Sequence, residues 1–333
     1  MKQATLSEKT RPIMAMVSWY FARVYGKAEG PGVAPAYCDP VRVGAFAVSP
    51  KALADGDDGA IFRVFVTLAM YQALRDEVIR SRQRALPRSS TRVVADGAFV
   101  RRSISKHDCS ALLSADAFDR DCDVWKNGRI VDCGRCPGLR CHVKDATVVF
   151  NRMGDMGKLP SSAWLRLWKS GGVRKVLADV CSEECSPTKR AALLVDRFAR
   201  VHRVGRKLAT MFVSALSTPA LAPGLTPWFP EVDGNELVVV DTNVARAVDA
   251  MRPSGAPRTY DVREAWIRDQ AARIDLRELH ADVPSYSPRL VQQALYAFCS
   301  KSNRTARGDQ CAAVPSACTD CAPALCPFAP TAP

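Results

Sequence analysis

Thirteen cysteines constrain this chain more than any other feature of its 333 residues. Near the C-terminus, four of them follow the pattern C-x6-C-x2-C-x4-C: Cys311, Cys318, Cys321 and Cys326. Four thiolates so close in sequence can hold a tetrahedral zinc ion or a [4Fe–4S] cluster, and spacing alone does not decide between the two. Because the N-terminus lacks the apolar core of a secretory signal, we expect a reducing compartment, where cysteines ligate metals rather than form disulfides.

The charge of the chain favours a polyanionic partner. With 47 lysines and arginines against 34 acidic residues, the net charge is +13, which favours a nucleic acid held by phosphate contacts over an ordinary basic protein without such a partner. Since 47% of the residues are hydrophobic, the chain can bury a core and is not a disordered tail. No apolar run reaches the ~18 residues of a membrane span, so we expect no membrane contact and a cytoplasmic, nucleoid-associated protein.

Helical periodicity dominates the rest of the sequence and predicts an all-α fold. Apolar residues recur at helical spacing over seven segments, which are 60–84, 160–185, 188–200, 209–216, 241–251, 262–279 and 288–298. Ser161 or Ser162 is the expected N-cap of the second segment, and Gly171-Gly172 is expected to break it. The apolar residues 237–240 suit either a short strand or an extended entry to a helix at Asp241.

A second group of cysteines lies in residues 85–150. We interpret this segment as an insertion that is stabilised by its own cysteine cluster. The run C-x2-C-x4-C-H ends at His142 and predicts a zinc site whose best quartet is Cys122, Cys133, Cys136 and Cys141. His142 or Cys109 could substitute for one of these ligands. The alternative is a set of unliganded thiols in an exposed loop.

A short basic turn, Val204-Gly205-Arg206-Lys207, lies between two helical patterns. Gly205 permits a tight turn with positive φ, and the helix that follows offers backbone N–H groups to a phosphate. Arg203 and Arg206 add positive charge. An uncharged Lys207 amine is a nucleophile that can form a Schiff base with a sugar carbon, although such turns are more often simple helix caps.

Asp241 follows the apolar residues 237–240 and precedes Thr242-Asn243. Aspartate is well suited to cap a helix at this place. A capping carboxylate that also faces a cleft can stabilise an oxocarbenium-like sugar or activate a nucleophile. Tryptophans offer weaker candidates: Trp164 and Trp168 suit a helical core stripe, whereas Trp228-Phe229 could contact a flipped base.

Taken together, the run 202–209 followed by 240–246 resembles the helix–hairpin–helix and catalytic aspartate segment of the endonuclease III / MutY superfamily of DNA glycosylases. Residues 69–76 resemble the early helix of that family, and the C-terminal cysteines complete the order. The likeness spans residues 55–84 and 155–326. Three departures stand out: Arg203 replaces a hairpin glycine, His202 replaces a proline, and the last cysteine loop is one residue shorter.

The resemblance implies a two-lobed helix–hairpin–helix glycosylase. Residues 1–54 would pack with the cluster lobe, 55–235 would form a helical-barrel lobe, and 236–333 would form the C-terminal lobe with the iron–sulfur loop. Lys207 and Asp241 would be catalytic, and Gln72 would enter the gap left by the flipped base. Double-stranded DNA would be the partner and would contact Arg203, Val204, Gly205 and Arg206, and a [4Fe–4S] cluster would bind Cys311, Cys318, Cys321 and Cys326.

The expected activity is therefore base excision by a monomeric enzyme, with an associated abasic-site (AP) lyase step through Lys207. Asn243 favours an alternative, since the adenine-excising branch often has asparagine after its aspartate; the enzyme would then be a monofunctional glycosylase for mismatched adenine or a modified pyrimidine. Two further alternatives are a non-catalytic DNA-binding module of the same fold and a zinc-stapled regulatory protein.

Overall fold

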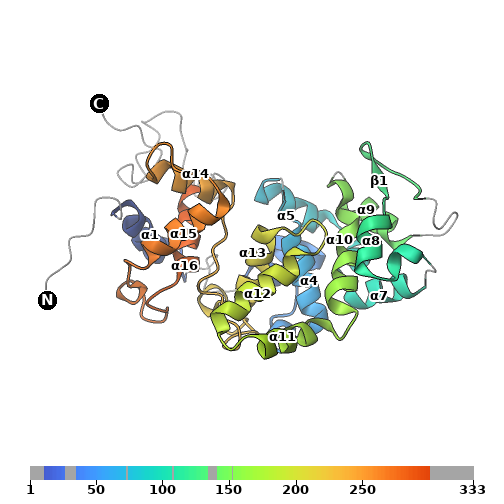
Figure 1. Ribbon diagram of the computed structural model, residues 1–333, viewed down its shortest axis with the longest axis horizontal. Coiled ribbons are helices and arrows are strands. Elements are labelled where there is room, and N and C mark those ends of the chain that lie inside the picture. Colours follow the sequence, from blue (N-terminus) through green and yellow to red (C-terminus); the bar gives the residue numbers. More distant parts are fainter. Residues whose placement is uncertain are drawn as a thin grey trace. The chain divides into compact units, whose positions relative to one another are not determined.

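The computed structural model describes residues 11–26, 35–72, 74–106, 109–133, 141–151 and 153–300 (Figure 1). These residues are mostly helical, which confirms the all-α prediction; among them β structure is limited to one two-stranded hairpin. The chain divides into two compact units. We call them the terminal unit (Met1–Ala34, Thr218–Pro223 and Gly234–Pro333) and the central unit (Pro35–Ser217 and Gly224–Asp233).

The central unit contains twelve α-helices and the hairpin within its described residues. The helices are α2 (Pro40–Val43), α3 (Pro50–Ala54), α4 (Asp58–Ala69), α5 (Asp76–Ala85), α6 (Arg88–Ala95), α7 (Gly97–Ser105), α8 (Ala115–Asp121), α9 (His142–Phe150), α10 (Lys158–Ala163), α11 (Gly172–Glu183), α12 (Pro187–Ala199) and α13 (Arg206–Ser217). The strands are β1 (Trp125–Lys126) and β2 (Arg129–Ile130). Residues 35–54, predicted to belong with the N-terminal segment, lie in this unit, where α2 packs on α5.

An aromatic cluster forms the core of the central unit. Phe62 and Phe65 of α4 meet Trp168, with the Phe62 and Trp168 ring centroids 4.9 Å apart. Phe198 of α12 lies 4.7 Å from Phe212 of α13, and Trp228 packs edge-on against Phe212 at 5.4 Å. Trp168 therefore has the predicted core role. Trp228 is also a core residue, whereas the neighbouring Phe229 keeps 42% of its surface exposed.

Polar caps set many of the helix starts. The Asp57 carboxylate accepts from the Ala60 N–H at 2.7 Å, and Ser186 caps α12 with a proline at the first helical position. The segment 60–84, predicted as one helix, is two: α4 ends at Ala69, and α5 starts at Asp76. Gln83 of α5 donates to the Thr67 carbonyl at 3.0 Å, so α5 folds back onto the end of α4.

The segment 160–185 differs from the prediction at its start. The helix begins at Lys158, and Ser161 and Ser162 are buried inside it, so the predicted N-cap was wrong. Both hydroxyls bond to other parts of the unit instead, Ser161 to the His142 ring and Ser162 to the His202 backbone N–H. Residues 164–168 form a π-helical turn, and the predicted break occurs at Gly171 and Gly172, which adopt φ values of 115° and 73°.

The terminal unit packs four described α-helices around one apolar core. They are α1 (Arg11–Arg23), α14 (Thr242–Met251), α15 (Tyr260–Ala271) and α16 (Pro288–Cys299). Residues 237–240 form an extended entry to α14, not a strand. The Tyr260 hydroxyl fixes this entry, because it donates to the Val238 carbonyl at 2.8 Å and accepts from the Val240 N–H at 3.2 Å. The predicted helix 262–279 ends early, at Ala271, and a 3-10 turn follows at Leu276–Glu278.

Throughout the described ranges, none of the helices has the length and apolar character that crossing a membrane requires.

Candidate active site

The predicted lysine turn is a β-turn followed at once by α13. The Val204 N–H donates to the Val201 carbonyl at 2.9 Å, which places Arg203 third in the turn. Arg203 adopts a φ of 64°, a conformation that glycine favours at this turn position. Gly205 is not at positive φ, so the prediction assigned the left-handed residue wrongly. Arg203, not Gly205, is therefore the left-handed residue of this turn.

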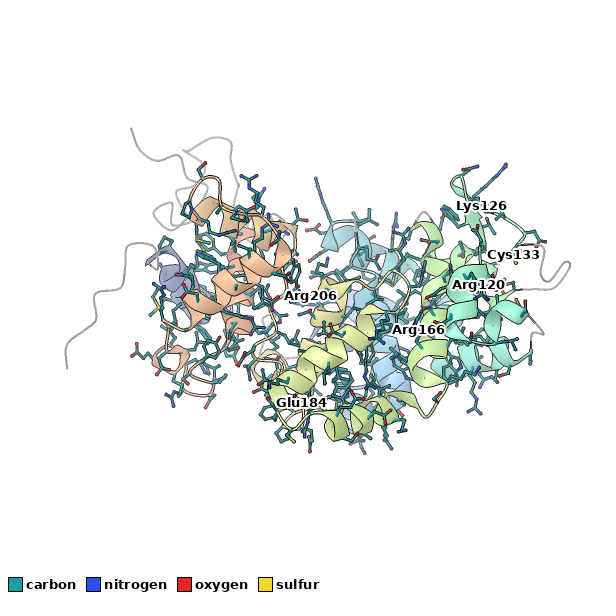
Figure 2. All side chains as sticks on the ribbon, viewed as in Figure 1. Arg120, Lys126, Cys133, Arg166, Glu184 and Arg206 are labelled. Carbon is teal, nitrogen blue, oxygen red and sulfur yellow. The ribbon has the colours of Figure 1, made fainter. Side chains whose placement is uncertain are left out.

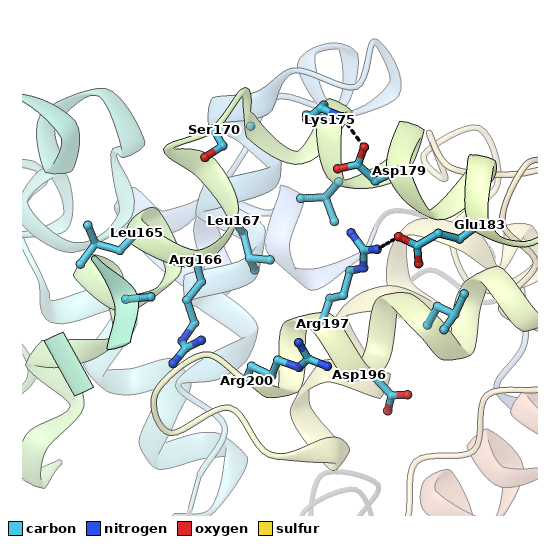
Figure 3. Close-up of a pocket in the computed structure, with 14 residues that line it drawn as sticks. Leu165, Arg166, Leu167, Ser170, Lys175, Asp179, Glu183, Asp196, Arg197 and Arg200 are labelled. Carbon is cyan, nitrogen blue, oxygen red and sulfur yellow. Dashed lines mark hydrogen bonds and ion pairs between the residues drawn. The ribbon is translucent and has the colours of Figure 1, made fainter. Parts of the chain in front are cut away.

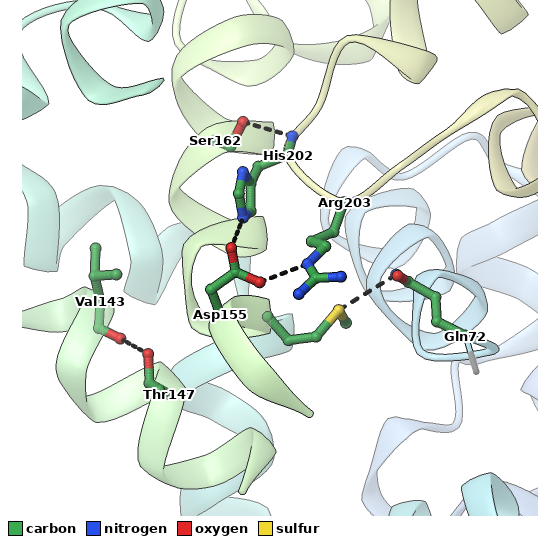
Figure 4. Close-up of polar contacts among 8 residues, drawn as sticks. Gln72, Val143, Thr147, Asp155, Ser162, His202 and Arg203 are labelled. Atoms are coloured by element: carbon green, nitrogen blue, oxygen red, sulfur yellow. Dashed lines mark hydrogen bonds and ion pairs between the residues drawn. The ribbon is translucent and has the colours of Figure 1, made fainter. Parts of the chain in front are cut away.

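Arg203 is held in this strained conformation by Asp155 (Figure 4). The Arg203 Nε donates to Asp155 Oδ1, and His202 Nε2 lies 2.9 Å from Asp155 Oδ2. Asp155 lies in the 3-10 turn Gly154–Gly157, where a β-carbon on Gly154 would approach the Arg203 guanidinium to 3.2 Å. The His202 N–H also donates to Ser162 Oγ at 3.0 Å. Three contacts therefore fix the turn and offset the cost of a left-handed side-chain-bearing residue.

The charge states within this cluster follow from its burial and its partners. Burial raises the pKa of Asp155, but the Arg203 hydrogen bond and the nearby charges of His202 and Arg203 outweigh it, so that the pKa is lowered. The pKa of His202 is lowered too, first by burial and then by the charge of Lys158, against the opposing effect of Asp155. At neutral pH the carboxylate is therefore charged and the imidazole is neutral.

The lowered pKa of Asp155 predicts an acid-sensitive contribution to stability. A carboxyl group whose folded pKa lies below its unfolded value stabilises the fold above the unfolded pKa, about 3.9, and loses that contribution as pH falls through the folded pKa. We expect the urea midpoint of the wild-type protein to fall more steeply between about pH 5 and pH 3 than that of Asp155→Asn. Equal slopes in urea titrations across this range would contradict the assignment.

Arg203 allows a paired test of the turn conformation. Arg203→Gly removes the left-handed strain together with the ion pair, whereas Arg203→Ala removes the ion pair and keeps the strain. Because both variants lack the ion pair, their difference reports the backbone strain alone, and the glycine variant should be more stable than the alanine variant by about 1 kcal/mol. Urea denaturation measures the difference, and an alanine variant as stable as the glycine variant would refute positive φ at this residue.

Lys207 and Gln72 come together although they are far apart in the sequence. The half-buried Lys207 side chain, in the first turn of α13, donates from Nζ to the Tyr71 carbonyl at 3.2 Å. Gln72 follows Tyr71 directly, and its Nε2 donates to the Ala69 carbonyl at 2.6 Å. The same Nε2 donates to Met156 Sδ at 3.3 Å, the contact drawn from Gln72 to a sulfur atom in Figure 4.

Met156 is the neighbour of Asp155 in the 3-10 turn, so these contacts join three segments: the end of α4, the Gly154–Gly157 turn and the start of α13. We call this group the lysine-turn site; its members are Tyr71, Gln72, Asp155, Arg203 and Lys207. Asp155 was not predicted, because a single aspartate between glycine-containing turns carries no sequence signal of its ion pair.

The backbone at Gly205 faces open space. A β-carbon placed on Gly205 would have nothing within 4 Å, although Val204 before it is buried. The 12-residue helix α13 begins next to it, at Arg206, and the start of a helix attracts anions through its dipole and its outward-pointing N–H groups. A phosphate group could therefore approach the chain closely here.

Asp241 caps α14 as predicted. Its Oδ1 accepts from the Val244 N–H at 2.7 Å, and its Oδ2 accepts from Asn243 Nδ2 at 3.2 Å. The carboxylate is partly exposed and is anchored through the extended residues that Tyr260 holds. Asp241 belongs to the terminal unit and Lys207 to the central unit.

A cavity of about 480 Å³ in the central unit was not predicted (Figure 3). It lies against α11, α12 and the π-helical turn, and its charged lining residues are Arg166, Lys175, Asp179, Glu183, Asp196, Arg197 and Arg200. Lys175 pairs with Asp179, and Arg197 pairs with Glu183, so much of the charge is neutralised within the wall. Because both signs alternate around the cavity, it offers no uniformly basic surface to a phosphate.

The predicted metal ligands are only partly within the described residues. Cys311, Cys318, Cys321, Cys326 and Cys136 lie outside them. His142, named as a possible substitute ligand, is buried, and both of its ring nitrogens have protein partners: Nε2 lies 2.9 Å from the Val93 carbonyl, and Nδ1 lies 3.0 Å from Ser161 Oγ. Cys122 is buried, and Cys109, Cys133 and Cys141 are partly exposed.

Comparisons of the chain with protein-family models, with curated proteins and with solved structures find no match in any of the three.

Proposed function

We propose that this protein is a DNA glycosylase that removes a damaged or modified base and then cleaves the strand through a lyase step at Lys207. The observation that carries the proposal is the contact between Lys207 and Tyr71, which joins the lysine turn to the Gln72 segment within one folded unit. The lysine turn and the Gln72 segment were each identified from the sequence without reference to the other. A glycosylase needs both beside the same nucleotide.

Binding to DNA would use the start of α13. A backbone phosphate would approach the open face of Gly205, supported by the net charge of +13 and by the side chains of Arg203 and Arg206. Chemistry on a base inside a duplex requires the nucleotide to rotate out of the stack. Gln72 would enter the space that the rotated base leaves, as the resemblance to the glycosylase superfamily implies.

The proposed chemistry breaks three bonds of the sugar in turn. The glycosidic bond breaks with its electron pair leaving on the base, and the uncharged Lys207 amine forms a C–N bond at C1′ of the sugar. Asp241 stabilises the positive charge that develops on the sugar and accepts a proton from the new amine. The C1′–O4′ bond then breaks, O4′ takes up the proton from Asp241, and the opened sugar is left as a protonated imine. Loss of a C2′ proton to water releases the 3′ phosphate as the C3′–O bond breaks, and a further water molecule hydrolyses the imine to an aldehyde and frees Lys207.

The Tyr71 carbonyl gives Lys207 a fixed direction for this reaction. A carbonyl oxygen accepts one N–H of the amine, so the lone pair of the uncharged amine must point elsewhere. In the proposal a [4Fe–4S] cluster held by Cys311, Cys318, Cys321 and Cys326 has a structural role and takes no part in these steps.

The test is a screen of the purified protein on duplexes that each carry one modified or mismatched base, followed by borohydride reduction on abasic-site DNA. Base release together with a borohydride-trapped protein–DNA adduct is expected. Base release without strand nicking or an adduct would select the monofunctional alternative. DNA binding with no base release on any duplex would favour a non-catalytic DNA-binding module.

A further inference from the structure

The β1–β2 hairpin joins two chain segments that each carry a cysteine. Its two-residue turn is Asn127-Gly128, with φ values of 49° and 76°, and its register pairs Trp125 with Ile130. The pairing continues outward, because the Val131 N–H donates to the Val124 carbonyl at 3.0 Å. Cys122, which ends α8, lies two residues before Val124, and Cys133 lies two residues after Val131, so the two cysteines are at matching positions on the two arms. Figure 2 labels Cys133 and Lys126 in this part of the chain.

Two more thiols reach the same place from other segments. Lys144, in the first turn of α9, forms an ion pair with Asp132 at 3.4 Å. Asp132 is the chain neighbour of Cys133, and Cys141 is the N-cap of α9, so this ion pair holds the segments of Cys133 and Cys141 together. Cys109 precedes the 3-10 turn Ser110–Leu112, and this turn packs on α8, which ends just before Cys122.

A buried lysine supplies a counter-charge for an anionic centre. Lys158 is only 8% exposed, and its ammonium lies 5.3 Å from the centroid of the Phe118 ring. Phe118 is one turn before Cys122 on α8, and its carbonyl accepts the Cys122 N–H at 3.0 Å. A zinc ion bound by four thiolates carries a net negative charge, which a buried ammonium nearby stabilises.

We propose that Cys109, Cys122, Cys133 and Cys141 bind a structural zinc ion that staples the hairpin to α8 and α9. Four sulfur ligands suit Zn²⁺ in tetrahedral geometry, with Zn–S distances of about 2.3 Å. Across the described ranges, no three His, Cys, Asp or Glu side chains yet form a group that could hold a metal. In the proposed site the bound ion brings the four sulfur atoms into contact with it, and each ligating thiol releases its proton to solvent. Relative to the predicted quartet, Cys109 takes the place of Cys136.

The experiment uses the full chain and reads metal content, not activity. Purified protein is analysed for zinc and iron separately, before and after Cys122→Ser with Cys133→Ser. We expect the double variant to lose one equivalent of zinc while its iron content is unchanged. The matched control is Cys181→Ser with Cys185→Ser, two thiols elsewhere in the central unit, which should keep that zinc. Equal zinc in both double variants would overturn the site.

A second measurement needs no variant and guards against a misfolded mutant. Wild-type protein is alkylated with iodoacetamide, with and without a zinc chelator, and each cysteine is followed by mass spectrometry. The chelator should expose Cys109, Cys122, Cys133 and Cys141 together and should leave the reactivity of Cys185 unchanged. Independent reactivity of the four, or a Cys122–Cys133 disulfide in the untreated protein, would refute zinc binding.

Discussion

Replacing Lys207 by alanine is expected to abolish the borohydride-trapped adduct with abasic-site DNA. The adduct requires a covalent bond between a protein amine and C1′, and alanine has no nucleophile to form it. The loss should be complete in the trapping assay, whereas duplex binding should weaken only slightly, because Arg203 and Arg206 remain beside the same turn. The trapped fraction is measured by denaturing gel electrophoresis against a titration of wild-type enzyme.

The matched control for this change is Lys189→Ala. Lys189 is an exposed lysine in the first turn of α12, also in the central unit, where the Ser186 hydroxyl caps the helix. Its replacement removes one positive charge at a helix start and should leave the adduct unchanged. An undiminished adduct in Lys207→Ala would move the lyase step to another amine and remove the main support for the proposed function.

Replacing Asp241 by asparagine is expected to slow base release on the order of 10³-fold. Asparagine loses the negative charge that would stabilise the sugar cation. It is nevertheless as good a helix cap as aspartate, so α14 should keep its stability. Single-turnover rates of base release measure the first effect, and a thermal unfolding curve that coincides with wild type verifies the second.

Asp275 provides the control for this second prediction. Its carboxylate also caps a helical turn in the terminal unit, accepting from the Arg277 N–H at 3.1 Å. Asp275→Asn also removes one negative charge from an N-cap of the terminal unit, and it should leave base release at the wild-type rate. A rate in Asp241→Asn within about threefold of wild type would reduce Asp241 to a structural cap, because general acid–base groups typically contribute at least 10²-fold.

Much of the helical architecture could be predicted from local patterns. Asp241 and Gly171-Gly172 acted as cap and break where the sequence placed them, because these residues work through their immediate neighbours. The start of α10 could not be found in this way. Ser161 and Ser162 have the composition of a cap, but His142 and the His202 backbone, both distant in sequence, bind their hydroxyls inside the helix.

The candidate site shows the same division. Lys207 and Gln72 were identifiable because they lie in recognisable local motifs, and the structure adds that Tyr71 connects them. The conformation of Arg203 was not predictable from the residue type, because an arginine at positive φ depends on an ion pair with Asp155, far away in the chain. The pairing of Trp125 with Ile130, which brings the segments of Cys122 and Cys133 together, depends on a hairpin register that the turn at Asn127-Gly128 fixes.

The left-handed arginine ties two distant positions into one evolutionary unit. A glycine at position 203 would fit the turn without help, whereas any other residue there depends on a compensating partner such as Asp155. Loss of Asp155 while Arg203 is present would leave the left-handed arginine without its ion pair. We therefore expect a substitution of Asp155 to follow, and not to precede, a change of Arg203 to glycine. Among relatives of this chain, positions 155 and 203 should therefore co-vary, with glycine at position 203 wherever position 155 lacks a carboxylate.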